Sequence, residues 1–234
     1  MEDFLSCNNL NFVPLNDFFK KISLLPYNEI EKQENKSEVY CGYGIYFQLK
    51  KDIDNMKKLY LISIEKGNAK AMCNLGVYYS EQSDYDNMKK YYLMSIKHGN
   101  TFAMNNLGCY YERKGDYVNM KKYYIMALEQ GNKISMFNLG AYYKEQKDYD
   151  NMKKYYLMAI EKKNKEAMYR LGMYFKNQKD IIQMIKYFEL GIEHKDKGSF
   201  KELESFYKKN QMNEKLLAFF SKYDKEKYID NIIF

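Results

Sequence analysis

The sequence has no tryptophan, only two prolines and only 12 glycines among its 234 residues. So few chain breakers argue against a β protein with many turns, and they favour helices. No apolar run approaches the roughly 18 residues that a membrane-spanning helix needs, and the first residues lack the basic and apolar regions of a signal peptide. We therefore expect a soluble, intracellular, cytoplasmic protein with no membrane span.

Residues that carry chemistry are also scarce. There are two histidines and four cysteines, and no two cysteines form a C-x-x-C pair. This excludes the common zinc-binding and thiol-redox motifs, and no phosphate-binding loop or nucleophile elbow is present. Only Arg113 and Arg170 among the 38 basic residues are arginine, so the net charge of +7 comes almost entirely from lysine. The chain therefore has few of the planar guanidinium groups that bind phosphates and bases. We predict no catalytic residues, no metal site and no cofactor, and therefore no enzyme.

What the sequence does contain is an internal repeat of 32 residues. The motif Asn74-Leu75-Gly76 recurs as Asn106-Leu107-Gly108, Asn138-Leu139-Gly140 and Arg170-Leu171-Gly172. Extending this register predicts units at 37–68, 69–100, 101–132, 133–164, 165–196 and 197–222. Residues 1–36 are then an N-terminal cap or a separate docking element, and residues 223–234 form an apolar tail that caps the last unit or makes a dimer contact.

Each unit carries two apolar stripes of helical period. In the second unit the first stripe, helix A, comprises Ala71, Met72, Leu75, Tyr78 and Tyr79. The second stripe, helix B, comprises Tyr85, Met88, Tyr91, Tyr92 and Ile96. Helices of about 20 Å are too short to persist alone, so stacking must bury these stripes. The sequence predicts about six antiparallel helix pairs.

The joints between units read Gly67-Asn68, Gly99-Asn100 and Gly131-Asn132. The glycine suits the left-handed end of helix B, and the asparagine can cap the next helix A. The later joints, Lys163-Asn164 and Lys195-Asp196, lack the glycine. We expect these two joints to be set differently and the superhelix to change pitch after the fourth unit.

The residues from 127 to 140, ALEQGNKISMFNLG, resemble the joint of Sel1-like repeats, close relatives of the tetratricopeptide repeats. The resemblance covers about four fifths of the chain, although the loop between helices A and B is shorter than in most Sel1-like units. It implies an all-α, right-handed α-solenoid that acts as a non-enzymatic adaptor. The Asn-, Lys- and Tyr-rich units are also similar to arrays encoded by giant DNA viruses of amoebae, which suggests such an origin.

The resemblance further implies that helix A lines a concave groove that binds a peptide or a partner helix. Matched unit by unit, the predicted groove residues are Phe102, Asn105, Asn106, Cys109, Ile134, Phe137, Asn138, Tyr169, Arg170 and Met173. In the second unit the same positions are Lys70, Cys73, Asn74 and Val77. Aromatic residues and arginine dominate binding energies, which favours Phe102, Phe137, Tyr169 and Arg170 as the main contacts. The row of asparagines either forms part of a carboxylate clamp or bridges backbone groups of neighbouring helices.

A second surface is possible on helix B, where a Met-Lys-Lys motif recurs. The predicted basic ridge comprises Lys89, Lys90, Lys121, Lys122, Lys153 and Lys154. Such a ridge is either a solvated face or a binding surface of an RNA- or DNA-handling complex. A monomer and a weak homo-oligomer that associates through the apolar tail both remain open.

Overall fold

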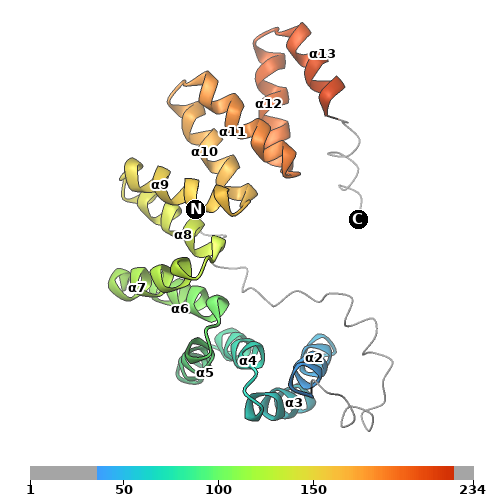
Figure 1. Cartoon of the computed structure of the whole chain (residues 1–234), viewed down its shortest axis with the longest axis vertical. Helices are drawn as coiled ribbons and strands as arrows, with labels where there is room; N and C mark the ends of the chain where they lie inside the picture. The colour runs from blue at the N-terminus through green and yellow to red at the C-terminus, as the bar shows by residue number, and fades with distance from the viewer. Residues whose placement is uncertain (1–35, 224–234) are drawn as a thin grey trace. The chain divides into compact units, whose positions relative to one another are not determined.

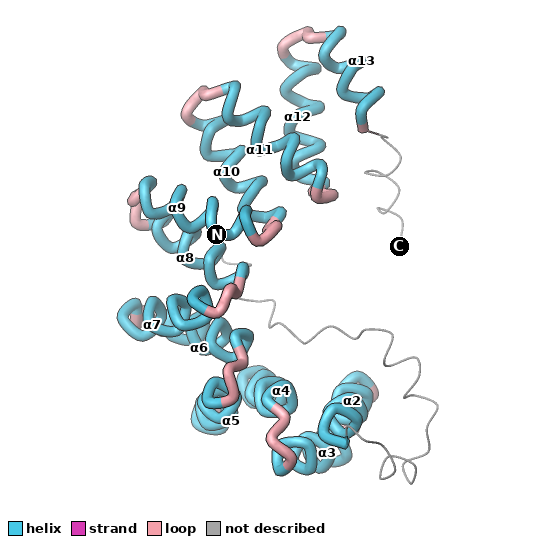
Figure 2. The backbone as a smooth tube through the Cα atoms, in the orientation of Figure 1, coloured by secondary structure: helices cyan, strands magenta, loops and turns pink. Residues whose placement is uncertain are grey.

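The computed structural model describes residues 36–223, and this part of the chain consists of helices joined by short turns (Figure 1, Figure 2). The helices are α2 (Lys36–Leu49), α3 (Ile53–Glu65), α4 (Ala69–Glu81), α5 (Tyr85–Lys97), α6 (Thr101–Arg113), α7 (Tyr117–Glu129), α8 (Lys133–Glu145), α9 (Tyr149–Glu161), α10 (Lys165–Asn177), α11 (Ile181–Glu193), α12 (Lys197–Lys209) and α13 (Asn213–Lys222). Even-numbered helices are the predicted A helices and odd-numbered ones the B helices. The predicted all-α helical-repeat solenoid is confirmed.

The chain divides into two compact units between Asn132 and Lys133. From here on, the first unit and the second unit are these two parts, and each 32-residue unit is called a repeat. The first unit contains the pairs α2/α3, α4/α5 and α6/α7, and the second contains α8/α9, α10/α11 and α12/α13. Within the first unit α2, α4 and α6 also contact one another in turn, as α10 and α12 do in the second. The predicted end segments 1–36 and 223–234 lie outside the described residues apart from Lys36 and Tyr223, so their capping roles stay predictions.

The first five helix pairs, from α2/α3 to α10/α11, each close around one glycine of helix A and one ring of helix B. The rings of Tyr60, Tyr92, Tyr124, Tyr156 and Phe188 are fully buried. They lie against Gly44, Gly76, Gly108, Gly140 and Gly172 so closely that a Cβ at any of these glycines would be 2.5–2.6 Å from a ring carbon. The Leu-Gly motif of the repeat thus marks where the two helices of a pair approach most closely.

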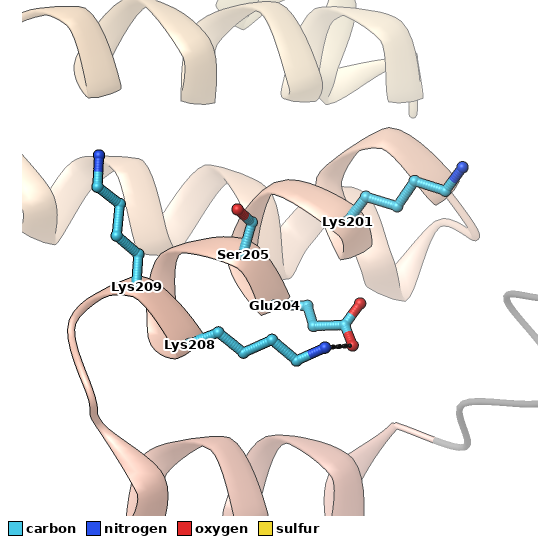
Figure 3. A pocket seen from close by; sticks show the side chains of 5 residues that line it. All are labelled: Lys201, Glu204, Ser205, Lys208 and Lys209. Atoms are coloured by element: carbon cyan, nitrogen blue, oxygen red, sulfur yellow. Dashed lines mark hydrogen bonds and ion pairs between the residues drawn. The ribbon is translucent and has the colours of Figure 1, made fainter.

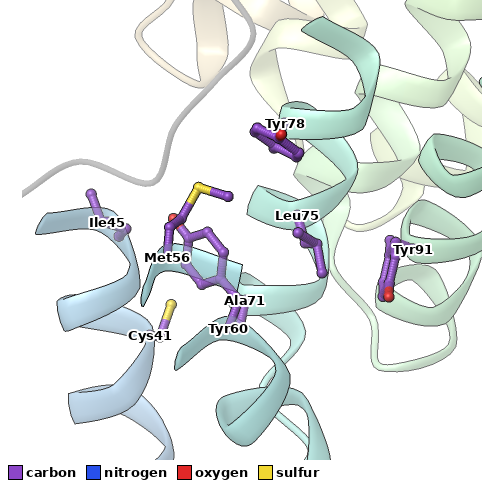
Figure 4. Packing of buried hydrophobic residues seen from close by; sticks show 8 residues of the cluster. All are labelled: Cys41, Ile45, Met56, Tyr60, Ala71, Leu75, Tyr78 and Tyr91. Carbon is purple, nitrogen blue, oxygen red and sulfur yellow. The ribbon is translucent and has the colours of Figure 1, made fainter. Parts of the chain in front are cut away.

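The same side chains connect one pair to the next. Tyr60 and Met56 of α3 lie between Cys41 of α2 and the apolar side chains Ala71 and Leu75 of α4 (Figure 4). Because the residues of α3 contact both the helix before and the helix after it, the core runs through successive pairs of the unit. This one-dimensional arrangement is what a stack of short helices requires.

The B helices begin at an aspartate cap with a reciprocal partner. The carboxylate of Asp84 accepts hydrogen bonds from the backbone N–H of Asn87 (3.1 Å) and from its side-chain amide (2.7 Å). Asp116 and Asp148 accept the same two bonds from Asn119 and Asn151. These bonds hold the pKa of each of the three carboxyl groups below its ordinary value, because only the ionised form accepts both.

These caps predict a pH-dependent stability. A carboxyl whose pKa is lower in the folded state stabilises the fold above its unfolded pKa of about 3.9, and this contribution is lost as the pH falls through the folded pKa. We therefore expect the melting temperature to decrease when the pH is lowered below about 4. In the triple variant Asp84→Asn, Asp116→Asn and Asp148→Asn, which keeps an acceptor but cannot ionise, the decrease should be smaller. Parallel pH profiles of the two proteins would disprove the assignment.

The joint asparagines bind two successive A helices. The side-chain oxygen of Asn100 accepts hydrogen bonds from the backbone N–H groups of Phe102 and Ala103, at 3.0 and 3.1 Å. Its side-chain amide donates to the carbonyl of Ala69, the first residue of the preceding A helix, at 3.3 Å. Asn164 likewise donates to the carbonyl of Lys133, at 3.2 Å. Each such asparagine therefore caps one helix and connects it to the previous one.

The later joints have the same local geometry as the earlier ones. Lys163 and Lys195 adopt left-handed backbone conformations, with φ of 58° and 60°, where Gly67 and Gly99 have φ of 79° and 74°. The expectation that these joints are set differently is wrong, and the predicted change of pitch loses its basis. The reason is that Asn164 and Asp196 still cap the following helices, and those caps require the same turn.

At these two joints between repeats, a lysine is consequently held in a strained conformation that glycine would relieve. The left-handed region costs a non-glycine residue about 1–2 kcal/mol, and the extra entropy of glycine in the unfolded state offsets part of this. We expect Lys163→Gly and Lys195→Gly each to raise the free energy of unfolding by about 0.5–1 kcal/mol. Lys162→Gly is the matched control, because Lys162 has a φ of −90°. Denaturant titration measures the free energy of unfolding of each variant. An equal change in Lys163→Gly and Lys162→Gly would contradict the prediction.

Candidate functional site

The ten residues of the predicted groove fall into two classes. Five are partly exposed: Phe102, Ile134, Tyr169, Arg170 and Met173. Five are buried: Asn105, Asn106, Cys109, Phe137 and Asn138. Only the first class can touch a partner without a movement of the helices.

The buried residues are covered because an A helix in the middle of a stack contacts helices on several sides. Helix α4 contacts α2, α3, α5 and α6, so it is surrounded within the first unit. As a result the matched positions Cys73, Asn74 and Val77 have no exposed surface. The helical period that places these residues on one face is correct, but that face of α4 is covered.

The asparagine row illustrates the same point. Asn74 is fully buried, and its side-chain amide makes no hydrogen bond of normal geometry within the described part of the chain. The nearby hydroxyl of Tyr60 donates instead to Gln48, at 2.7 Å. Asn74 therefore bridges no backbone groups, and its amide does not reach the surface as a carboxylate clamp would require.

Phe137 lies in the core of the pair α8/α9. Its side chain is 6% exposed, and its ring stacks on that of Tyr156 with centroids 5.6 Å apart. The resemblance predicts Phe137 as one of the main contacts of the groove. Its position makes it a packing residue of the second unit.

Of the four accessible groove residues of the second unit, Ile134 lies on α8, and Tyr169, Arg170 and Met173 lie on α10. Tyr169 packs its ring 6.1 Å from Phe188 and against the backbone of Gly198, where a Cβ would be 3.0 Å from the ring. Its remaining edge is open, and burial together with the negative charge of Glu202 raises the pKa of its hydroxyl. The guanidinium of Arg170 lies 3.9 Å from Glu166. An aromatic ring and a guanidinium group thus belong to consecutive residues of α10.

Helix α12 continues this surface. A shallow hollow of about 500 Å³ is lined by Lys201, Glu204, Ser205, Lys208 and Lys209 (Figure 3). Lys201 and Ser205 stand 32 residues after Tyr169 and Met173, in the same register of the repeat. The predicted groove ends at Met173 and does not include these two positions. Carrying the register one repeat further would have found them.

The lysines of the predicted basic ridge are all at least partly exposed. Lys89 and Lys153 form ion pairs with Asp86 (3.2 Å) and Asp150 (3.0 Å), and hydrogen bonds to these aspartates raise the pKa of both lysines. Lys90, Lys122 and Lys154 each lie over the ring of the tyrosine that follows in sequence, 5.3–5.4 Å from its centroid. Neighbouring carboxylates and rings thus engage five of these six lysines, and the ridge itself stays a prediction.

No constellation of reactive groups is visible in residues 36–223. Cys41, Cys73 and Cys109 are buried free thiols, and burial raises the pKa of Cys41 and of Cys73 to about 12. His98 and His194 both occupy the C-cap of a B helix, a position that suits the helix dipole. No group of three potential metal ligands occurs among the described residues. A buried neutral thiol is a poor nucleophile, so Cys41 and Cys73 serve packing.

None of the helices from α2 to α13 combines the length and the hydropathy that crossing a bilayer would take.

Comparison with known proteins identifies the repeat. The tetratricopeptide repeat pattern matches residues 69–97, 135–162 and 165–197. No curated protein sequence matches the chain.

Three solved structures share the fold. c5321, a protective antigen present in uropathogenic Escherichia coli strains and displaying an SLR fold, is 17% identical, with a TM-score of 0.60 over 99% of this chain and 54% of that protein. A Sel1 repeat protein from Oxalobacter formigenes is 19% identical, with a TM-score of 0.63 over 90% of this chain and 95% of that one. The APC/C hetero-tetramer Cut9-Hcn1 provides a chain that is 13% identical, with a TM-score of 0.56 over 92% of this chain and 44% of that one.

The chain thus spans about half the length of the first and the third of these proteins. The matches confirm the resemblance that the joint sequence suggested. The three matched repeats, the fold shared with Sel1 repeat structures and the period of 32 residues show that this chain is built of helical repeats similar to Sel1-like and tetratricopeptide repeats.

Proposed function

We propose that this protein is a non-enzymatic, intracellular scaffold that binds a peptide or helix of a partner protein on the A helices of its second unit. The observation that carries the proposal is the position of Tyr169, Arg170 and Met173. They are predicted groove residues, and all three remain accessible on α10. Aromatic rings and arginine are the side chains that contribute most to protein interfaces.

Two further points support this role. The helical-repeat fold is commonly a protein-interaction scaffold, and the Cut9-Hcn1 structure is an assembly of different proteins. The second unit also presents α10 and α12 in contact with each other, which gives a partner two adjacent helices to bind. The oligomeric state that we propose is a monomer or a weak homo-oligomer.

Site-specific photo-crosslinking tests the proposal. A photoreactive phenylalanine analogue replaces Met173 on α10. In the control it replaces Leu157 on the B helix α9, where the native side chain is 41% exposed. In native cell extract we expect discrete protein adducts from position 173 and none of these from position 157. Arg170→Glu should remove the adducts, because a partner selected by a guanidinium meets a charge of the wrong sign.

Controls separate binding from folding. Lys154→Glu reverses a charge on α9 in the same unit and should leave the adducts unchanged. Identical adducts from both positions, or adducts that survive Arg170→Glu, would reject the surface. If nuclease treatment removes the associated proteins and Lys154→Glu weakens the association, the basic ridge and a nucleic-acid-handling role replace the proposal.

A further inference from the structure

Helix α12 carries positive charge that no neighbour compensates. Three ion pairs are present on the A helices of the second unit: Arg170 with Glu166, Lys176 with Glu202, and Lys208 with Glu204. These pairs occupy the three glutamates of this surface. Of the three lysines that line the hollow, Lys201 and Lys209 have no acidic partner among residues 36–223, and both are exposed.

The two lysines border one hollow. They stand eight residues apart on α12, which corresponds to about 12 Å along the helix axis. Ser205 lies between them, exposed, and its hydroxyl makes no hydrogen bond within the described chain. Figure 3 shows Lys201 and Lys209 extending from the two ends of the hollow, while Lys208 turns the other way toward Glu204. The hollow therefore has a cation at each end and a hydroxyl in the middle.

This hollow continues the surface of α10. Tyr169 of α10 packs against Gly198 at the start of α12, and the ion pair of Lys176 with Glu202 joins the two helices further along. A segment that covers Tyr169 and Met173 and follows the surface onward reaches Lys201, Ser205 and Lys209 next. The positive charge of α12 therefore influences which partner segments can bind to this surface.

We propose that α12 selects an acidic segment of the partner, in which two acidic residues about 12 Å apart along the segment pair with Lys201 and Lys209. This inference rests on the proposed function and adds the chemistry of the ligand. In a helical partner the two acidic residues would stand eight positions apart, because a helix lying along α12 has the same rise per residue. The hydroxyl of Ser205 can donate a hydrogen bond to a carboxylate or a backbone carbonyl between them.

The same surface argues against a nucleic acid. A nucleic acid would bring a phosphate at every nucleotide, whereas the hollow offers two lysines without an acidic partner among residues 36–223 and is also lined by Glu204. Two isolated carboxylates match two isolated ammonium groups better than a continuous polyanion does.

The test uses the full chain and a fluorescein-labelled helical peptide in which two glutamates stand eight residues apart in an apolar and glutamine-containing frame. The matched control peptide has glutamine at both positions. By fluorescence anisotropy we expect the acidic peptide to bind about tenfold more tightly than the control peptide. We also expect Lys201→Glu with Lys209→Glu to abolish this difference, and added salt to reduce it. Lys154→Glu with Lys186→Glu changes the net charge equally on α9 and α11 and should leave the difference intact.

Several results would overturn the inference. Equal affinities for the two peptides would do so, and so would an equal loss of binding in the α9/α11 variant. Tighter binding only after removal of residues 224–234 would assign the hollow to the chain's own tail. If crosslinks from position 173 persist unchanged in the Lys201→Glu, Lys209→Glu variant, the scaffold role stands and the acidic partner is rejected.

Discussion

Gly108→Ala should destabilise this protein strongly, although alanine is the better helix former by about 1 kcal/mol. A Cβ at position 108 would lie 2.5 Å from a ring carbon of Tyr124, which is fully buried. The ring has little room to yield, because its hydroxyl donates to Glu112 at 2.7 Å. We expect a loss of about 3 kcal/mol or more, at the upper end of what overpacking costs. Urea titration followed by circular dichroism measures it.

A double variant isolates the cause. Tyr124→Ala alone should cost about 3–5 kcal/mol, because it removes a buried aromatic ring. Combined with Gly108→Ala, the total loss should be well below the sum of the single losses, since the new methyl group then meets no ring. Additive losses, or a Gly108→Ala variant as stable as the wild type, would show that the close approach of α6 and α7 does not constrain the pair.

The contact between glycine and ring could have been predicted from the sequence. Each Leu-Gly motif is followed at a constant distance by a ring, as in Gly76 with Tyr92 and Gly108 with Tyr124. A glycine that recurs inside a helical stripe requires a reason, and a closely packed aromatic residue is a common one. The caps were predictable in the same way, because Asp84 and Asn100 stand where a helix must begin.

Burial of the A helices was not predictable from periodicity. Period alone places Cys73, Asn74 and Val77 on one face, but it does not reveal that neighbouring helices cover that face of α4. The conformation at Lys163 was missed for a related reason. The residue type argues against a left-handed turn, whereas the cap at Asn164 requires one, and the requirement of the cap prevails.

Phe137→Glu is the substitution that best separates packing from binding in this protein. The side chain is 6% exposed and stacks on Tyr156, so the variant would place a carboxylate in the core of α8/α9. Loss of the buried ring alone costs about 3–5 kcal/mol, and an unpaired buried charge adds to this. We expect the second unit to melt far below the wild type, with exposed apolar surface that binds a hydrophobic dye.

A substitution at the surface supplies the comparison. Leu157→Glu places the same carboxylate on α9, where the native side chain is 41% exposed, and should change the melting temperature little. Phe137→Ala should already show most of the loss, because the ring contributes through contacts rather than through charge. If Phe137→Glu instead melted like Leu157→Glu while the crosslinks from position 173 disappeared, Phe137 would be reachable from outside. It would then belong to the binding surface, and the core of α8/α9 would have to form without it.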